Sequence, residues 1–295
     1  MSHTQTSLLP FFSVLAFSGE DRASFLHTQL SNHIEDLAVG HACYATYNTP
    51  KGRVIANMLV LNTGDELWVM VAKDLAEALA KRLRMFVMRA KVSIALNDDL
   101  VAAGVTTGAE PQQAGDTPLH QFAASHSDHV WHVALPNQSE LLLGQAEHVN
   151  ASHDATAEQA WWQTQILSGY PWVSQATTET CVAQMLNQTV LGGVHFKKGC
   201  YPGQEIIARA HYRGQVKRGL MTFTAKQAIA AGMPVLQDGA DAGIVINASP
   251  NANGYVALAV IKHGAANVAL TVNDGPIVAQ QYFFSTETDA KAEQA

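Results

Sequence analysis

Residues 197–205 of this 295-residue chain read KKGCYPGQE and contain one of its three cysteines, Cys200. Pro202 suits the first turn of a helix, where its missing N–H costs no hydrogen bond. The following residues, IIARAHYR, continue that helix, and Glu205 falls in its first turn. Cys200 is therefore expected just ahead of a helix N-terminus, where partial positive charge stabilises an anion. The stretch predicts a thiol held as the thiolate.

The same segment concentrates positive charge on an acidic protein. The chain carries a formal net charge of −7, yet residues 197–218 contain Glu205 as their only acid. Such a local excess predicts a site for an anion, and a polyglutamyl tail, a phosphate and an RNA backbone all remain open. A second basic cluster, residues 81–91, is interpreted as the solvated face of a helix. The bases of the first segment are Lys197, Lys198, Arg209, Arg213, Lys217 and Arg218.

The other two cysteines, Cys43 and Cys181, form no CxxC pair with each other or with Cys200. An odd, sparse count fits a reducing compartment, and it excludes a disulfide scaffold and a zinc or iron–sulfur site built from cysteines alone. Cys43 and Cys181 are interpreted as small, buried hydrophobic residues. No apolar run approaches the ~20 residues that cross a bilayer. We therefore expect a cytoplasmic protein with no membrane partner and no resident metal.

The first hundred residues alternate strand and helix patterns. Runs rich in β-branched and aromatic residues predict strands, and one helix places Leu75, Leu79 and Leu83 on a single stripe. This order favours an α+β domain over residues 1–100 with a largely antiparallel sheet. Strands are expected at 11–17, 43–48, 53–62, 66–72 and 91–96, and helices at 20–30 and 74–86.

The middle of the chain, residues 101–214, predicts a second α+β domain that carries the cysteine segment. Residues 107–128 are rich in Gly, Pro, Gln, Ser and His and are interpreted as a loop. Strands are expected at 129–135 and 141–144 and a helix at 155–167, whereas 174–196 show little periodicity.

The last part of the chain, residues 215–284, predicts a small barrel or sandwich. Short apolar runs alternate there with Gly, Asn, Asp and Pro, a pattern typical of strands joined by tight turns. Residues 285–295 are polar and are expected to be disordered. The runs lie at 220–225, 233–238, 242–248, 255–261, 267–272 and 276–284.

The cysteine segment resembles the signature of a known family. K-G-C-Y-x-G-Q-E looks like the signature of the YgfZ folate-binding proteins, which are relatives of the glycine-cleavage aminomethyltransferase, or T-protein. The resemblance extends over most of the chain and is weakest at residues 100–150. The matching residues are Lys198, Gly199, Cys200, Tyr201, Gly203, Gln204 and Glu205, with Leu191–Gly192–Gly193 before them and Ala208–Arg209–Ala210 and Lys217–Arg218 after them.

The resemblance implies three domains around a central channel that holds tetrahydrofolate or a derivative. It also implies a role in supporting iron–sulfur enzymes, notably those that methylthiolate tRNA, with Cys200 essential. Phe11 and Phe12 stand where some members carry a second pocket tryptophan, and phenylalanine cannot donate an indole N–H. The residues implied at the site are Cys200, Lys198 and Glu205 for the chemistry, and Trp161, Phe12, Tyr201, Gly203, Gln204, Arg209 and Arg213 for the folate.

One departure from the T-proteins separates the candidate mechanisms. T-proteins place an essential aspartate in the strand after the Lys51–Gly52 turn, where this chain has Ala56 and Asn57. Asparagine cannot ionise, so the inherited acid–base chemistry is not expected here.

Three functions remain open at this point. The first is a folate-dependent accessory factor for iron–sulfur enzymes, the second a one-carbon transferase, and the third a non-enzymatic folate sensor or RNA-contacting regulator that works through residues 197–218. In the first, the Cys200 thiolate attacks a one-carbon adduct, is shared as a ligand with a partner's cluster, or undergoes redox chemistry.

Overall fold

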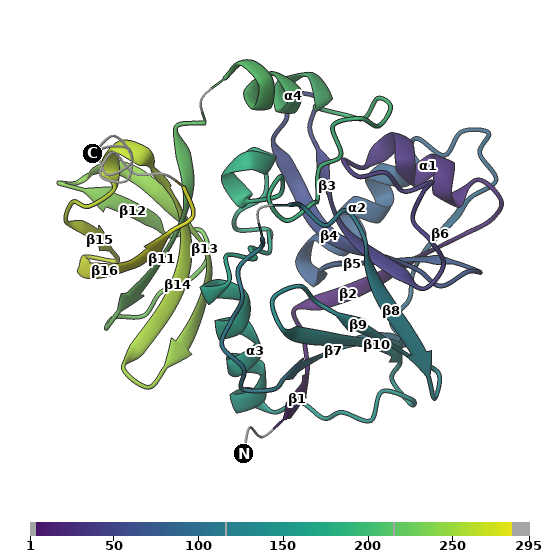
Figure 1. Ribbon diagram of the computed structural model, residues 1–295, viewed down its shortest axis with the longest axis horizontal. Coiled ribbons are helices and arrows are strands. Elements are labelled where there is room, and N and C mark those ends of the chain that lie inside the picture. Colours follow the sequence, from purple (N-terminus) through teal and green to yellow (C-terminus); the bar gives the residue numbers. More distant parts are fainter. Residues whose placement is uncertain (1–3, 116, 215, 285–295) are drawn as a thin grey trace.

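Two β-structures dominate the computed structural model, which describes residues 4–115, 117–214 and 216–284: a ten-stranded sheet and a closed barrel. In Figure 1 the barrel lies on the left and the sheet on the right, with helix α3 (Ala155–Leu167) between them. Helix α4 (Gln204–Arg213), which follows the cysteine segment, lies at the top. The barrel packs against the rest of the fold, because Leu220 and Ile246 belong to the same buried hydrophobic cluster as Val54 of the sheet.

The sheet is antiparallel throughout and has the order β1-β7-β10-β9-β8-β3-β4-β5-β2-β6. Every residue of β4 except the last is buried, because both faces of the sheet are covered there. Its strands are β1 (Gln5–Leu8), β2 (Phe12–Ser18), β3 (His41–Asn48), β4 (Val54–Asn62), β5 (Leu67–Ala72), β6 (Ser93–Leu96), β7 (Leu100–Thr106), β8 (Phe122–Ser127), β9 (Val130–Ala134) and β10 (Ser139–Gln145).

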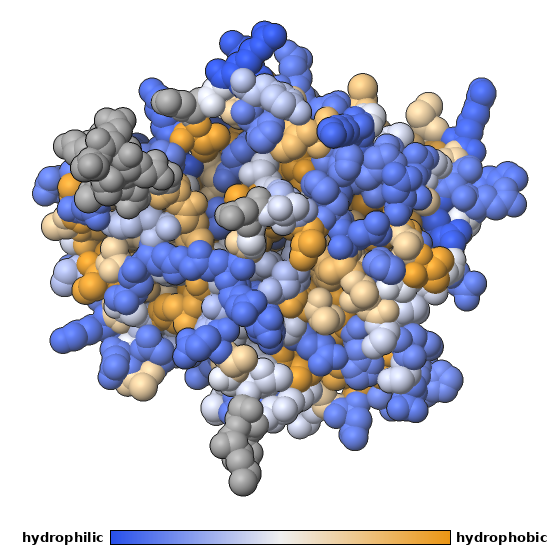
Figure 2. Space-filling model, viewed as in Figure 1, coloured by the Kyte–Doolittle hydropathy of each residue, from blue (hydrophilic) through white to orange (hydrophobic). Residues whose placement is uncertain are grey.

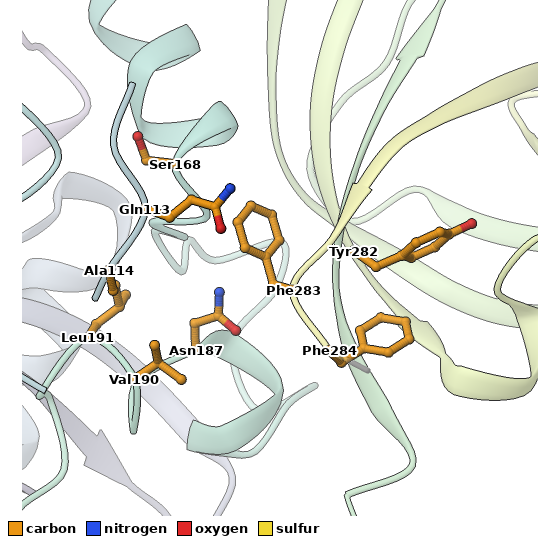
Figure 3. A pocket seen from close by; sticks show the side chains of 9 residues that line it. All are labelled: Gln113, Ala114, Ser168, Asn187, Val190, Leu191, Tyr282, Phe283 and Phe284. Atoms are coloured by element: carbon orange, nitrogen blue, oxygen red, sulfur yellow. The ribbon is translucent and has the colours of Figure 1, made fainter. Parts of the chain in front are cut away.

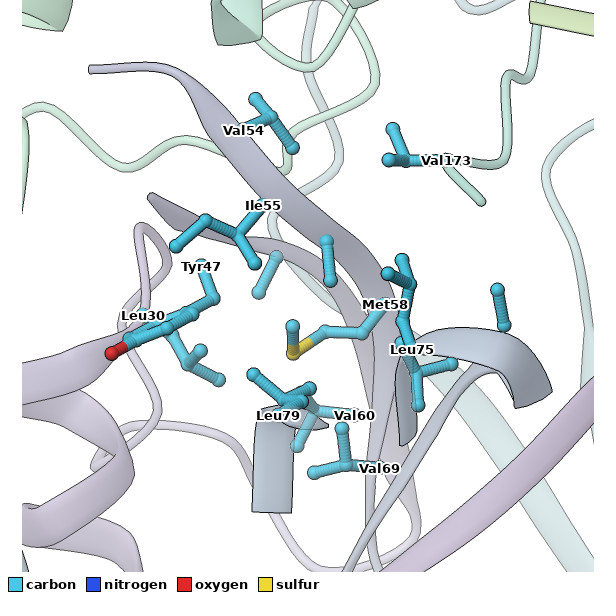
Figure 4. Packing of buried hydrophobic residues seen from close by; sticks show 14 of the residues in the cluster. Leu30, Tyr47, Val54, Ile55, Met58, Val60, Val69, Leu75, Leu79 and Val173 are labelled. Carbon is cyan, nitrogen blue, oxygen red and sulfur yellow. The ribbon is translucent and has the colours of Figure 1, made fainter. Parts of the chain in front are cut away.

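Successive side chains along the sheet strands point to opposite faces, and each face packs into its own hydrophobic interior. Cys43 and Tyr47 of β3 point into the first, whereas Tyr44 points into the second. Helices α1 (Arg22–Gln29) and α2 (Lys73–Arg84) cover the first interior, and Figure 4 shows Leu75 and Leu79 of α2 packed with Met58 and other residues of this cluster. Helix α3 contributes Trp161 to the second, and the Asp154 carboxylate caps α3 by accepting from the N–H groups of Thr156 and Ala157.

The C-terminal strands close into a barrel with the order β11-β14-β13-β12-β15-β16. Buried side chains such as Phe223, Val245 and Ala257 fill it. Two short 3₁₀ turns, η1 (Ala183–Leu186) and η2 (His263–Ala265), complete the elements. The barrel strands are β11 (Arg218–Ala225), β12 (Pro234–Gln237), β13 (Ala240–Asn251), β14 (Gly254–Lys262), β15 (Leu270–Val272) and β16 (Gly275–Tyr282).

The α+β class and the C-terminal barrel predicted from the sequence are confirmed. The interpretation of residues 107–128 as a loop is wrong at its end, because β8 occupies Phe122–Ser127, and β1 and β7 were not predicted. Most side chains of β8 are exposed, so it lacks the apolar run that marks a buried strand. The three-domain division stays a prediction, and the predicted disordered tail, 285–295, lies outside the described residues. Among the described helices, none is long and apolar enough to span a bilayer.

Candidate functional site: a cysteine segment and an aromatic interior

The cysteine segment is shaped by a glycine that allows close backbone contact. Gly203 caps α4 with φ of 80°, and a Cβ atom there would lie 2.6 Å from the carbonyl oxygen of Thr49 and 2.8 Å from Cα of Gly52. The segment therefore rests on the β3–β4 turn in a conformation that favours glycine. The predicted place of Pro202 in the first helical turn is wrong, because the helix begins at Gln204, although Glu205 does fall in the first turn.

Lys198 fastens this segment to helix α1. Its buried ammonium donates hydrogen bonds to the carbonyl oxygens of His27 and Leu30, the second at 2.5 Å, and lies 4.9 Å from the centre of the Tyr201 ring. Carbonyl groups at a helix C-terminus favour a cation. Burial lowers the pKa of Lys198 to about 8, against the opposing influence of Glu35, Cys200 and Cys43. Lys198 therefore acts as a positioning residue for the Cys200 segment.

Cys200 is the accessible thiol of the chain. It is exposed, whereas Cys43 and Cys181 are both buried. Burial raises the pKa of Cys43 to about 12 and also raises that of Cys181. Those two thiols are protonated at neutral pH, as their interpretation as small hydrophobic residues requires.

The outer face of α4 presents the arginines that the resemblance implies. Arg209 and Arg213 line a shallow open hollow together with Glu205, Ala208 and Tyr212. Neither arginine forms an ion pair within the part of the chain that the structure describes. Figure 2 shows a strongly hydrophilic surface over this end of the molecule, at the top of the view. Their charge is therefore available to an anion.

The second hydrophobic interior contains a group of aromatic rings that pack against one another. The Tyr44 ring lies 5.8 Å from that of Tyr170 and 6.2 Å from that of Trp172, while Phe12 lies 4.7 Å from Trp172 and 5.8 Å from Trp161. Burial raises the pKa of Tyr170 to about 12 and raises that of Tyr44 further, so both hydroxyls stay neutral.

Trp161 is a core residue of this interior. It is fully buried against Gly104 of β7, where a Cβ atom would lie 2.5 Å from the indole. Its neighbour Trp162 is partly exposed and stacks on Phe12 at 6.0 Å. Of these two adjacent tryptophans, Trp161 therefore faces the core.

Two asparagines hold the Tyr170–Val173 stretch between the sheet and the barrel. Asn57 of β4 donates to the carbonyl oxygen of Pro171 at 2.7 Å and accepts from the N–H of Val173 at 2.7 Å. Asn247 of β13 pairs in the same way with both backbone groups of Trp172, at 2.8 and 2.9 Å. Both amide ends of Asn57 are therefore engaged in positioning Trp172.

A hollow of about 390 Å³ opens at the junction of this interior and the barrel. Figure 3 shows Phe283 reaching from the barrel end toward Ser168 and Gln113, whereas Tyr282 and Phe284 lean back toward the barrel. Gly169 accommodates the Phe283 ring, because a Cβ atom there would lie 2.6 Å from it. The lining residues are Gln113, Ala114, Ser168, Asn187, Val190, Leu191, Tyr282, Phe283 and Phe284.

Polar atoms without partners collect around this hollow and the aromatic interior. Gln165 donates to Ser139, and Ser139 donates to Asn137, yet the remaining amide atom on both Gln165 and Asn137 has no partner. Buried polar atoms normally find hydrogen-bond partners, so such a concentration marks a place where a polar ligand would be stabilised. The unpartnered atoms are Tyr44 Oη, Asn137 Nδ2, Trp161 Nε1, Gln165 Oε1, Ser168 Oγ, Trp172 Nε1 and Gln188 Oε1.

The structure sorts the site residues predicted from the sequence into two groups. Lys198, Cys200, Tyr201, Gly203, Gln204, Glu205, Arg209 and Arg213 form the cysteine segment and α4, whereas Phe12 and Trp161 belong to the second interior. Among the described residues, no hydrogen bond or ring contact joins the two groups directly. Residues 187–200 connect them, since Leu191 lines the hollow and Gly193 lies against Tyr44.

The molecule belongs to the aminomethyltransferase-type fold class. It superposes on the glycine cleavage system aminomethyltransferase T from Bartonella henselae with a TM-score of 0.72, covering 96% of this chain and 86% of that chain at 9% sequence identity. Such a likeness establishes the fold alone.

Within this class, the chain belongs to the YgfZ family. It is 30% identical over 221 residues to the tRNA-modifying protein YgfZ of Edwardsiella ictaluri (strain 93-146), covering 69% of this chain and 66% of that protein. It is 28% identical over 229 residues to the tRNA-modifying protein YgfZ of Klebsiella pneumoniae (strain 342), covering 72% and 69%. The matched segments span about two thirds of these relatives' length, and no family model matches the chain.

Proposed function

We propose that this chain is a cytoplasmic, folate-binding accessory protein of tRNA modification that supports iron–sulfur enzymes of the methylthiolating type. Tetrahydrofolate or a derivative would occupy the hollow and the aromatic interior, and Cys200 would be the functional thiolate. The relatives' name supports the tRNA-modification context, and the aminomethyltransferase-type fold supports the folate. The observation that carries the proposal is the set of unpartnered polar atoms beside the aromatic rings.

The residues present fit a pterin. A pterin is flat and aromatic and carries both donors and acceptors, and the interior offers rings together with indole, hydroxyl and amide groups of both kinds. Tyr44 and Tyr170 keep their protons because burial raises their pKa values, so each can donate a hydrogen bond at neutral pH. Ser168 and Asn187 line the hollow through which the ligand would pass. When bound, the folate would supply a one-carbon unit or its acceptor.

The cysteine segment and helix α4 would position the thiol and bind an anion. Lys198 holds the segment that presents Cys200, and Glu205 lies in the first turn of the next helix. Arg209 and Arg213 offer unpaired positive charge to an anion, either the glutamate tail of a folate or an RNA backbone. The Cys200 thiol is open to solvent and therefore to a partner protein.

A one-carbon transferase of the T-protein kind is the weaker alternative. Asn57 stands where the T-protein aspartate is expected, and its amide already bonds Pro171 and Val173. A neutral side chain that is fully used in holding the backbone has no capacity left for acid–base work.

Titration with tetrahydrofolate and its 5-formyl and 5,10-methylene forms, followed by tryptophan fluorescence, tests folate binding. Val190→Trp should fill the hollow and weaken binding at least tenfold, because Val190 lines it and is 44% exposed, so the substitution should spare the core. Val278→Trp, at a 62% exposed position beside a separate surface hollow of the barrel, is the matched control and should bind as wild type does. Equal affinity of both variants would refute this location.

The RNA contact has its own test. If α4 neutralises phosphates, the tRNA affinity of the protein should fall with salt, and Arg209→Ala and Arg213→Ala should each reduce the slope of log K against log[salt] by about 0.7 to 0.9. Lys262→Ala, which removes a half-exposed cation on the barrel, is the control. Unchanged slopes would exclude phosphate contacts by these arginines and would leave the glutamate tail of a folate as their proposed ligand.

A further inference from the structure

Four histidine rings form a row beside the Cys200 segment. The ring centres of His27 and His33 are 4.4 Å apart, those of His33 and His195 are 5.5 Å apart, and those of His195 and His120 are 4.6 Å apart. The four come from separate stretches of the chain: α1, the loop after it, the loop before β8, and the segment that leads to Cys200. The row therefore joins elements that are distant in sequence.

Adjacent rings of the row pack directly against one another. The first two pairs are inclined at 73° and 77°, the edge-on contact that aromatic rings prefer, and the third pair is tilted at 59°. The Nδ1 atoms of His27, His33 and His195 are buried without a hydrogen-bond partner. In the described part of the chain no three His, Cys, Asp or Glu groups are placed to hold a metal ion.

The row lies where the cysteine segment is fastened to the rest of the protein. The N–H of His195 donates to the carbonyl oxygen of Ser31 at 2.9 Å, and the Ser31 hydroxyl donates to that of Gly193 at 2.5 Å. The Asn32 amide donates to the carbonyl oxygen of Gly192 at 3.0 Å. Together with Lys198 on His27, these contacts hold residues 192–198 against residues 27–32. All of these side chains except Lys198 are uncharged.

Protonation would place positive charges next to one another. His27 faces Lys198, His33, Glu35 and Asp36, and burial, then Lys198, lowers its pKa. His195 faces His120, His33, Asp36 and Lys198, and burial, then the two histidines, lowers its pKa. The opposing carboxylates are exposed, with Glu35 3.7 Å from His27 Nδ1 and Asp36 3.4 Å from His33 Nδ1.

The lowered pKa values of His27 and His195 determine the sign of the pH dependence of stability. Both folded-state pKa values lie below the 6.5 of the unfolded chain. The contribution of His27 and His195 to stability is therefore fully present above pH 6.5 and is lost as the pH falls through their lowered folded-state pKa values.

We propose that the histidine row is an acid-sensitive latch, which holds the Cys200 segment on α1 while its rings are neutral and releases it when they are protonated. Release would free Cys200 together with the Leu191 wall of the hollow, since both lie on the same segment. The latch is independent of the folate proposal, because it concerns only how the segment is held.

A pH-insensitive fluorophore attached to Cys200 tests the latch, since the other two cysteines are buried. In the wild type, fluorescence anisotropy should fall reversibly as the pH is lowered from 7.5 to 5, with its midpoint below 6.5, while far-UV circular dichroism stays constant. His195→Phe and His33→Phe keep an aromatic ring but cannot be protonated, so their anisotropy should stay at the high value.

His148→Phe is the matched control. His148 stacks on His129 at 4.6 Å, another contact between two histidines, at the β8–β9 and β10 ends of the sheet, and this variant should titrate as the wild type does. Constant anisotropy in the wild type would overturn the proposal. So would a transition of wild-type size in both His195→Phe and His33→Phe, or a fall that accompanies loss of the circular dichroism signal.

Discussion

The Cys200 segment and the aromatic interior differ in how their residues are brought together. The residues of the segment are contiguous in sequence, and Gly203 and Lys198 attach them to the distant β3–β4 turn and to the end of α1. The interior is assembled from β3, β4, α3, residues 170–173 and β13, which are distant in sequence. A motif can therefore reveal the first, whereas the second exists only after the sheet and barrel have packed together.

The largest expected effect tests whether the interior depends on Asn57. Asn57→Asp would leave the Pro171 carbonyl facing a buried carboxylate, which raises the pKa of that new carboxyl group above the ~4 of an unfolded chain. A rise of two to three units would cost about 3 to 4 kcal/mol of the free energy of unfolding at pH 7. The protonated acid can donate to Pro171 again, so the deficit should disappear below pH 4.

Urea unfolding at pH 4 and pH 7 measures this deficit. Asn62→Asp is the control, because Asn62 ends the same strand and donates to a carbonyl oxygen at 2.7 Å, but it is only partly buried. Its loss should be about 1 kcal/mol. Equal losses at the two sites would mean that the hydrogen bonds of Asn57 to Pro171 and Val173 contribute no more to stability than a partly buried hydrogen bond at the strand end.

The second-largest expected effect concerns the Cys200 segment and tests whether Lys198 is buried in the folded protein. Its pKa of about 8 in the folded protein is below the ~10.4 of an unfolded lysine, so the unfolded chain binds more protons between these values. Stability should therefore rise with pH from 8 to 10.4, by up to about 3 kcal/mol. Lys198→Met should abolish the rise. Lys91→Met, which alters an exposed pair with Glu20, should retain it, and a rise that survives in Lys198→Met would exclude burial of this amine as its cause.

The same contrast explains what the sequence could and could not predict. Barrel strands were predicted from short apolar runs separated by turn residues, and α3 was predicted to the residue, with Gly169 and Pro171 marking its end. Strand β7 was missed because its AAGV core has small residues, and Gly104 is small because Trp161 packs on it. A pairing partner that is distant in sequence leaves no local pattern.

At the site, the sequence indicated Cys200, Lys198 and Gly203, because they stand together in one contiguous motif. It did not indicate Tyr44, Ser168 or Phe283, each of which is an ordinary residue of a strand or helix end until the barrel meets the sheet. The Gly169–Tyr170–Pro171 sequence was a usable signal for the part of the site where Gly169 contacts Phe283 and Tyr170 joins the aromatic interior. The histidine row had none, since its members are scattered from position 27 to 195.

A smaller effect is expected from two glycines of the motif. Gly203→Ala forces a left-handed residue and a Cβ contact of 2.6 Å with backbone, which should cost about 1 to 3 kcal/mol of the free energy of unfolding. Gly199→Ala should cost less than about 0.5 kcal/mol, because its nearest neighbour would be His27 Nε2 at 3.7 Å. Thermal unfolding of both variants compares them, and equal losses would show that the segment does not rest on the β3–β4 turn as described.

The smallest effect on stability should come from Cys200 itself. Cys200→Ser changes one exposed atom, so the free energy of unfolding should stay within about 0.5 kcal/mol of wild type, whereas Cys43→Ser buries a hydroxyl group and should cost about 1 to 3 kcal/mol. In a deletion strain, however, Cys200→Ser should fail to restore methylthiolated tRNA bases and iron–sulfur enzyme activity, while Cys43→Ser should restore both in proportion to the amount of folded protein. Full rescue by Cys200→Ser would show that the exposed sulfur is dispensable and would favour a folate sensor acting through α4. Failure of Cys200→Ser to restore function, together with rescue by Cys43→Ser, would support the proposed role of the exposed thiol.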